Sequence, residues 1–250
     1  MANLFGKLTL KFGLVRLGWC HAAVTTGFLP SSIHRYGIQD VWRGMPEVGR
    51  AILAGDFTFH GETFSLGNDS WRKINQMNLA WQREMHGFAW LRDVTAFSEE
   101  AVDAARIRQF IQGWWRRQLH HHPVGRHPDI AGERIANWLI YSDFLLKGAT
   151  TAFRRRYWRQ IYGNLIRLER ARQRKQGRTS LTVLKGLILG ALILPQAGFL
   201  VAPALKTLRQ AMATRFLPDG GHVSRSPEWQ AQEMRILMEI RALLDERKIG

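Results

Sequence analysis

The stretch LPDGGHVSRSPEWQ, residues 217–230, sets how the C-terminal part of the chain folds. Its PDGG segment predicts a sharp backbone turn, because glycine adopts positive φ without steric cost. Ser226 then suits a helix N-cap, Pro227 suits the first helical position, and Glu228 suits the positive end of the helix dipole. The stretch is therefore predicted to join two helices.

Two side chains that can carry a positive charge stand between this turn and the new helix. His222 is a titratable imidazole and Arg225 is a permanent cation. Short loops between rigid elements often carry function. The alternative interpretation is a plain connection whose polar side chains are only solvated.

The spacing of apolar residues indicates six helices after Ser98. Their expected ranges are 98–118, a segment that begins at Asp129 or Ala131, about 150–173, 181–194, 202–216 and 226–247. Most of the loops between them are short, which favours antiparallel helical hairpins. Upstream, residues 27–50 are expected to be irregular and residues 75–90 helical. Turn signals around short apolar runs predict a small β-hairpin near residues 51–66.

The apolar segment 187–205 has the composition of a membrane span, but Pro195 and Gly198 interrupt it and Lys185 and Lys206 flank it. Two buried helices joined by a tight turn are the better interpretation.

Residues 2–26 predict a separate amphipathic helix at the N-terminus. Lys7, Lys11 and Arg16 interrupt its apolar residues, and no small-residue cleavage site follows, so it is not a secretory signal. The interpretation is a mature helix that makes peripheral membrane contact, in a protein of the cytoplasm or the periplasm. A single cysteine excludes an internal disulfide framework.

The charge balance points to polyanionic partners. The chain has 36 Lys and Arg against 20 Asp and Glu, a net charge of +16, which favours an acidic polysaccharide, a nucleic acid or an anionic membrane face. Ten cations crowd the expected helix at 150–173 and its exit: Arg154, Arg155, Arg156, Arg159, Arg167, Arg170, Arg172, Arg174, Lys175 and Arg178. They form either a solvated outer face or a track for a polyanion. Nucleic-acid binding rests on charge alone and is the weakest of these interpretations.

Four blocks of sequence resemble one known family. They are FTFHG at 57–61, HGFAWLRD at 86–93, RIANWL at 134–139 and DGGHVSRSP at 219–227. In this order they are similar to blocks of heparinase II/III-type polysaccharide lyases. The resemblance implies an all-α fold, an incomplete (α/α) toroid of antiparallel helical hairpins, followed by a β-sandwich domain. It implies a division into residues 1–34, an N-terminal helix and linker, and residues 35–250, an incomplete toroid domain without the expected sandwich.

The family's activity is the β-elimination of uronate-containing polysaccharides. That reaction needs a group that neutralises the uronate carboxylate, a base for the C5 proton and an acid for the leaving oxygen. The resemblance implies an Asn-His pair before the loop and a Tyr-His pair after Ser226-Pro227. Here Arg178 and Thr179 occupy the first pair, and Trp229 and Gln230 the second. Neither tryptophan nor glutamine can act as a base at neutral pH.

Other residues must therefore take the roles of the two missing pairs in the candidate site. His222 and Tyr141 are the candidate catalytic residues, and the candidate substrate-binding residues are Arg134, Asn137, Arg225, Trp90, Trp138, Trp229 and Gln230. Trp90 and Trp138 would stack on sugar rings. The alternatives are that Trp138 fills the core and that Arg134 pairs with Asp129 or Asp143.

Two functions stay open. The first is a lyase-like domain that acts on or binds an acidic polysaccharide, and the second is a catalytically silent module that binds a glycan or another polyanion. No cofactor is expected, because the chain has no nucleotide-binding or zinc-ligand motif. No metal site is expected either: adjacent residues such as His120, His121 and His122 splay around a helix, and no acidic partner lies near them in the sequence.

Overall fold

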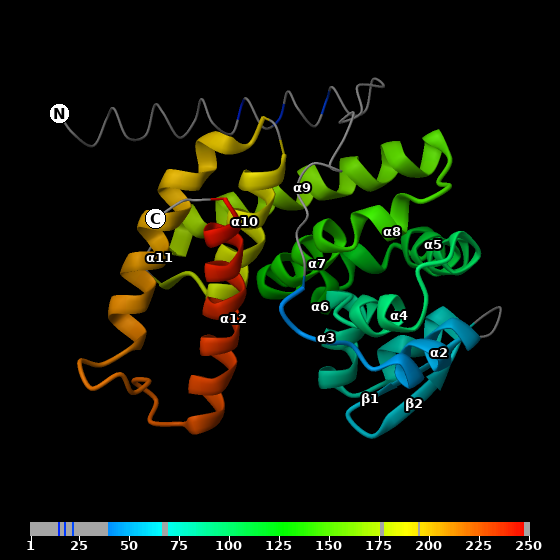
Figure 1. The fold of residues 1–250 in the computed structure, drawn as a ribbon, viewed down its shortest axis with the longest axis horizontal. Helices are drawn as coiled ribbons and strands as arrows, with labels where there is room; N and C mark the ends of the chain where they lie inside the picture. Colours follow the sequence, from blue (N-terminus) through cyan, green and yellow to red (C-terminus); the bar gives the residue numbers. More distant parts are fainter. Residues whose placement is uncertain are drawn as a thin grey trace. The chain divides into compact units, whose positions relative to one another are not determined.

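Helices joined by short turns make up most of the chain (Figure 1). The computed structural model describes residues 40–66, 70–175, 178–194 and 196–247, together with Val15, Gly18 and Ala22. The predicted N-terminal helix at 2–26 therefore lies almost entirely outside the described residues. The chain divides into two compact units. One is Ile38–Thr150; the other is Thr151–Gly250 together with Met1–Gly37.

The 38–150 unit contains short helices and one small sheet. Its elements are α2 (Pro46–Ala54), β1 (Asp56–Phe59), β2 (Glu62–Ser65), η1 (Ser70–Gln76), α3 (Leu79–Gly87), α4 (Leu91–Phe97), α5 (Ala101–Arg116), η2 (Leu119–His121), α6 (Pro123–Arg126), α7 (Pro128–Ile140) and α8 (Ser142–Leu146). The two strands pair antiparallel, with Asp56 opposite Ser65 and Phe59 opposite Glu62. His60 and Gly61 form the turn, both at positive φ. The small β-hairpin predicted within 51–66 is confirmed.

The sequence predicts irregular structure up to residue 50 and a hairpin from residue 51, and for residues 46–54 both predictions are wrong. These residues form helix α2, because Pro46 suits its first turn and Gly55, at φ 107°, ends it in the left-handed region. Gly49 lies where α2 crosses α4 so closely that any side chain at this position would overlap the backbone of Asp93.

Aromatic rings fill the interior of this unit. Phe88 packs edge-on against Trp114 and Trp138, with ring centroids 5.4 and 5.3 Å apart. Phe57 of the sheet packs in the same way against Trp90, at 5.4 Å. Such edge-to-face pairs add to the stability gained from burying large rings. All five rings are buried, so the aromatic blocks of the sequence form core.

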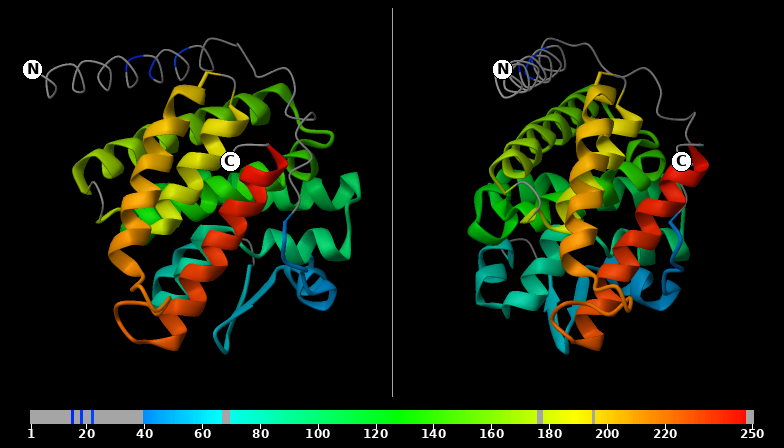
Figure 2. Two further views of the ribbon diagram at one scale, coloured as in Figure 1. Left: turned by 60° about the vertical axis from the view of Figure 1, so that its left-hand side comes forward. Right: turned by 90° about the vertical axis from the view of Figure 1, so that its left-hand side faces the viewer.

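Four long helices are described in the 151–250 unit. They are α9 (Thr151–Lys175), α10 (Leu181–Ile193), α11 (Val201–Arg215) and α12 (Pro227–Glu246), with the short turn η4 (Gly198–Leu200) before α11. Helix α10 is apolar and almost wholly buried, and it packs against α9, α11 and α12 (Figure 2). The ranges predicted for these four helices are confirmed to within two residues.

The apolar segment 187–205 is divided as predicted. Helix α10 ends at Ile193 and α11 begins at Val201. None of the helices in the described part of the chain is both long and apolar enough to cross a membrane.

Candidate functional site

The loop between α11 and α12 is held by its own backbone. The Val223 N–H donates to the Arg215 carbonyl at 2.8 Å, and the Leu217 N–H donates to the Gly221 carbonyl at 2.9 Å. Gly220 has φ 82° and Arg225 has φ 53°. Ser226 caps α12 by accepting from the Trp229 N–H at 3.4 Å, as predicted. A positive φ at a residue other than glycine indicates a conformation imposed by the surrounding contacts.

His222 is buried beneath this loop, and each of its ring nitrogens lies close to a polar partner. Nδ1 accepts from the Ser224 backbone N–H at 3.1 Å and lies 2.6 Å from the Ser224 hydroxyl. A backbone N–H can only donate, so Nδ1 is the unprotonated nitrogen and Nε2 carries the proton. Nε2 lies 3.2 Å from Glu233 Oε2, an oxygen that has no well-aligned hydrogen-bond donor. The imidazole thus has no nitrogen turned toward a substrate.

Glu233 links His222 to a second region singled out by the sequence. Its other oxygen accepts from Arg215 Nε at 2.9 Å, and Arg215 Nη2 donates to the Thr179 carbonyl at 3.1 Å. Thr179 occupies a position that the family resemblance assigns to a histidine. The fold therefore connects residues 179, 215, 222 and 233, although the side chain of Thr179 offers no base.

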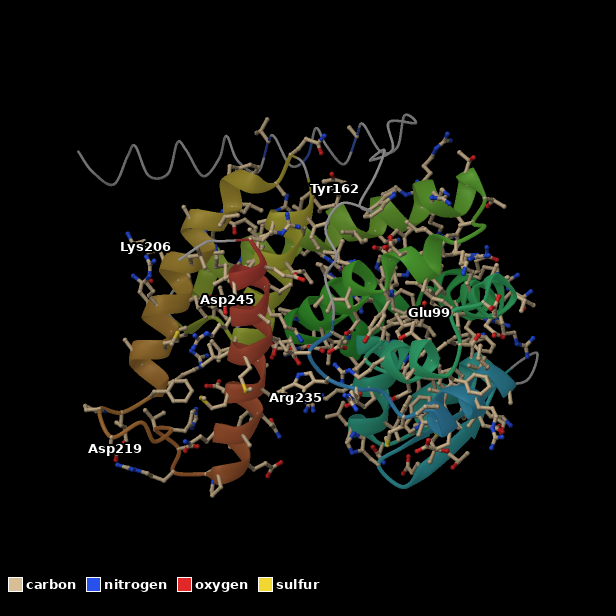
Figure 3. The ribbon with its side chains drawn as sticks, viewed as in Figure 1. Glu99, Tyr162, Lys206, Asp219, Arg235 and Asp245 are labelled. Atoms are coloured by element: carbon tan, nitrogen blue, oxygen red, sulfur yellow. The ribbon has the colours of Figure 1, made fainter. Side chains whose placement is uncertain are left out.

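Arg225 is paired within the loop. Its Nη1 donates to Asp219 Oδ2 at 2.9 Å, and both side chains are exposed. The Gly221 N–H and then Arg225 lower the pKa of Asp219, so the carboxylate stays ionised. Asp219 lies on the turn that joins α11 to α12 (Figure 3). Arg225 therefore does not present an uncompensated positive charge.

Gln230 closes the loop from the first turn of α12. Its amide nitrogen donates to the Gly220 carbonyl and its amide oxygen accepts from the His222 N–H, both at 3.4 Å. Trp229, in contrast, is 56% exposed. It is the only exposed tryptophan in the described part of the chain, and it alone among the candidate tryptophans offers a ring to a partner.

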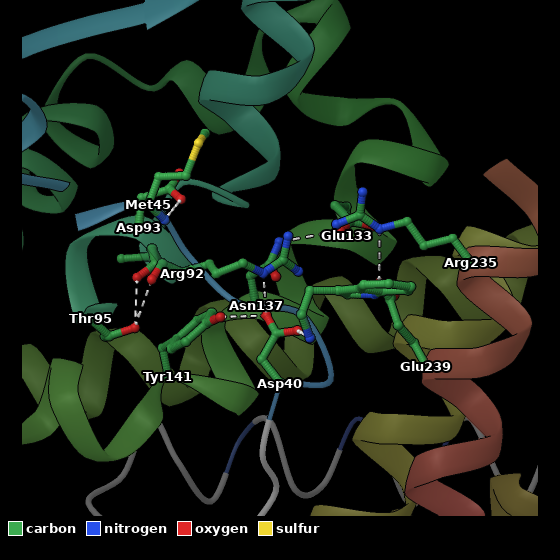
Figure 4. A network of polar contacts seen from close by, with 12 residues as sticks. Asp40, Met45, Arg92, Asp93, Thr95, Glu133, Asn137, Tyr141, Arg235 and Glu239 are labelled. Atoms are coloured by element: carbon green, nitrogen blue, oxygen red, sulfur yellow. Dashed lines mark hydrogen bonds and ion pairs between the residues drawn. The ribbon is translucent and has the colours of Figure 1, made fainter. Parts of the chain in front are cut away.

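Tyr141, the second candidate catalytic residue, lies in the 38–150 unit and is held by Asp40 (Figure 4). Its hydroxyl donates to Asp40 Oδ2 at 2.5 Å, and Arg92 Nε donates to the same oxygen at 2.7 Å. Burial, and then the hydrogen bond and charge of Asp40, raise the pKa of Tyr141. The phenol is therefore a fixed donor and a poor base, and its raised pKa also makes it a weaker acid.

Arg134 and Asn137 are buried and bind backbone carbonyls. Arg134 donates to the carbonyls of His86 and Gly125 at 3.1 and 3.0 Å, with its guanidinium 5.1 Å from the Trp114 ring. Asn137 donates to the Gly87 carbonyl at 3.0 Å. Both side chains thus brace the ends of short elements, and neither is exposed to a substrate.

Trp90 and Trp138 are not accessible for stacking on a sugar ring. Both are buried, with 2% and 0% of their surface exposed. The alternative stated for Trp138, that it fills the core, fits its position between Phe88 and the neighbouring tryptophans. The loop candidates and these core candidates belong to different units.

The histidine cluster of the 38–150 unit is not arranged as metal ligands. His86 Nδ1 accepts from the Trp114 indole N–H at 2.9 Å, which leaves the proton on Nε2. The His86 ring stacks on His122. In the described residues no group of three or more histidine, cysteine or acidic side chains could hold a metal ion.

Helix α9 carries a buried arginine and several exposed ones, while Arg154, Arg156 and Arg167 are half-buried. Arg172 is buried and bidentate to Glu169, at 2.7 and 2.8 Å, and also donates to Thr207 on α11. Arg155, Arg159, Arg170 and Arg174 are exposed on the opposite face. No described carboxylate pairs with these four, which we call the arginine stripe. The period of 3.6 residues per turn would have separated the buried arginine from the exposed ones from sequence.

No family model, curated protein or solved structure matches the chain. The resemblance to heparinase II/III-type proteins therefore stays a prediction. The candidate site is defined by the residues themselves: a closed loop around His222, one exposed tryptophan and the arginine stripe.

Proposed function

We propose that this protein binds an acidic polysaccharide through the arginine stripe of α9 and does not cleave it. The supporting observation is that the four exposed arginines face away from the core with no described carboxylate beside them. Exposed guanidinium groups suit the carboxylate and sulfate groups of such a polymer, because their planar donors bind two oxygens at once.

The local charge supports this proposal. Glu169 is the only acidic residue between Thr151 and Pro218, and it is already bound by Arg172. Residues 1–39 contain no acidic residue at all. Burial lowers the pKa of Arg156, and the positive charge of Arg159 lowers it further, as expected where like charges are crowded. A polyanion would relieve this repulsion.

The state of the candidate catalytic groups favours binding over elimination. Both ring nitrogens of His222 lie close to polar partners, and Tyr141 has a raised pKa. Trp229 and Gln230 supply neither an acid nor a base of suitable strength. A lyase would have to break the His222 contacts before any proton could be taken from a sugar.

The aromatic residues of α9 argue against a single-stranded nucleic acid. Tyr157, Trp158 and Tyr162 are all buried, whereas proteins that hold single strands usually offer exposed rings on which bases stack. The resemblance to heparinase II/III-type proteins favours a polysaccharide. We further propose that the helical hairpins are part of an incomplete (α/α) toroid within residues 35–250, as that resemblance implies.

The test compares binding of alginate and heparan-type chains by wild-type protein and by a variant with Arg155, Arg159, Arg170 and Arg174 changed to Gln. We expect binding to weaken at least tenfold, about 1.4 kcal/mol. The matched control changes four exposed arginines of the other unit to Gln: Arg43, Arg83, Arg116 and Arg126. It removes the same net charge and should weaken binding much less.

Three results would contradict the proposal. Equal loss in both variants would mean that net charge alone attracts the polymer. Tighter binding of a single-stranded oligonucleotide at the same salt concentration would favour the nucleic-acid interpretation. Growth of the ultraviolet absorbance of unsaturated uronate would show that the protein is a lyase.

A further inference from the structure

The arginine stripe consists of two pairs separated by a stretch of α9 that has no exposed cation. Arg155 and Arg159 are one turn apart, as are Arg170 and Arg174. Each pair spans about 6 Å along the axis, and the gap from Arg159 to Arg170 is about 16 Å. On the exposed side of the gap lie Gly163 and Ile166, neither of them charged.

One cation, Arg167, lies within this gap, but it is not exposed. Arg167 is half-buried, and its guanidinium donates to the side-chain oxygen of Asn164 on the same helix. Helix α9 is one uninterrupted element of 25 residues (Figure 2). The separation of the two pairs is therefore set by a rigid helix.

We infer that the two arginine pairs are two separate contacts for one extended polyanionic chain that lies along α9. This rests on the proposed function and adds that the site recognises chain length. A chain shorter than the gap reaches one pair only. A chain that spans Arg155 to Arg174, about 28 Å, binds both pairs at once.

The physical reason is effective concentration. Once one pair holds a long chain, the other pair meets the chain as an intramolecular partner, so affinity rises without any new kind of contact. Because α9 fixes the distance between the pairs, no ordering of the protein opposes the second contact. Affinity should therefore rise steeply at one chain length instead of increasing evenly with each added sugar.

The experiment measures binding of heparan-type oligosaccharides of increasing length to wild-type protein and two double variants. One variant changes Arg155 and Arg159 to Gln; the other changes Arg170 and Arg174 to Gln. The matched control changes Arg116 and Arg126 to Gln, two exposed arginines of the other unit.

For wild-type protein we expect affinity to rise at least tenfold once the chain spans both pairs. Either double variant should abolish this rise, yet weaken binding of short chains by no more than about twofold if the pairs are equivalent. The dependence of affinity on salt should be about twice as steep for long chains as for short ones, because twice as many ionic contacts form. The control variant should keep the length threshold.

Different failures have different meanings. If long chains bind but both double variants weaken long and short chains by the same factor, or if affinity shows no step with length, the two-contact arrangement is wrong and polysaccharide binding stands. If wild-type protein binds no chain of any length, the proposed function fails and this inference fails with it.

Discussion

The indole N–H of Trp114 donates to Nδ1 of His86 at 2.9 Å in the interior of the 38–150 unit. The contact keeps the imidazole neutral, because a protonated Nδ1 would face the indole proton. Burial, followed by the charges of Arg134 and His122, lowers the pKa of His86 to about 3.

Acidification should therefore destabilise the protein. Below pH 6.5 the unfolded chain protonates His86 and the folded chain does not, so the unfolded state binds more protons and stability falls with pH until about pH 3. The full effect of this residue is on the order of 5 kcal/mol. His86→Gln keeps an acceptor for Trp114 and cannot titrate, so urea unfolding at several pH values should show a flatter dependence. His121→Gln, at an exposed position, serves as control and should keep the wild-type slope.

Glu169→Gln should be strongly destabilising. Glu169 is 1% exposed and is the carboxylate that neutralises the buried Arg172. Removing one partner leaves a buried charge, which costs about 3–5 kcal/mol. Arg170→Gln at the adjacent exposed position should change the free energy of unfolding by less than about 0.5 kcal/mol. Equal unfolding midpoints for the two variants would refute this account of the pair.

Gly49→Ala should destabilise the 38–150 unit, because a methyl group would overlap the backbone of Asp93 where α2 crosses α4. We expect a loss of about 1–3 kcal/mol, as for other overpacked sites. Gly198→Ala is the matched control, since a methyl group there meets no atom within 4 Å. Thermal unfolding monitored by circular dichroism distinguishes the two.

Arg225→Ala should change polysaccharide binding by less than about twofold. Arg225 is paired with Asp219 on an exposed turn, and such pairs contribute little. This prediction differs from the expectation from the sequence that Arg225 binds the substrate directly. A loss of affinity of tenfold or more, measured by titration calorimetry, would show that the polysaccharide binds at the loop.

The sequence predicted the elements of this fold better than their contacts. Apolar spacing and the Ser226-Pro227 start were sufficient for α9 to α12, because these are local signals. Helix α2 was missed because Gly44 and Gly55 resemble loop punctuation, whereas Gly44 packs closely on the backbone of Arg92 and Gly55 ends a helix.

The candidate site was harder to predict because burial depends on tertiary packing. Nothing in the local sequence distinguishes the buried Trp138 from the exposed Trp229. The contact of His222 with Glu233 depends on how α12 folds back beside the loop, and that of Arg172 with Thr207 joins two helices. Of the features of the candidate site, only the division of α9 into buried and exposed arginines could have been obtained from periodicity.

The closed loop around His222 has a consequence for protease access. Arg225 is exposed and followed by Ser226, so trypsin would be expected to cut there. A protease, however, must draw several residues into an extended conformation, and here the Arg225 N–H is bonded to the His222 carbonyl while Gln230 ties both Gly220 and His222 to α12. Cleavage after Arg225 must therefore wait until the α11–α12 hairpin opens. The rate of cleavage after Arg225 therefore reports how often the hairpin opens, and Gln230→Ala should increase that rate.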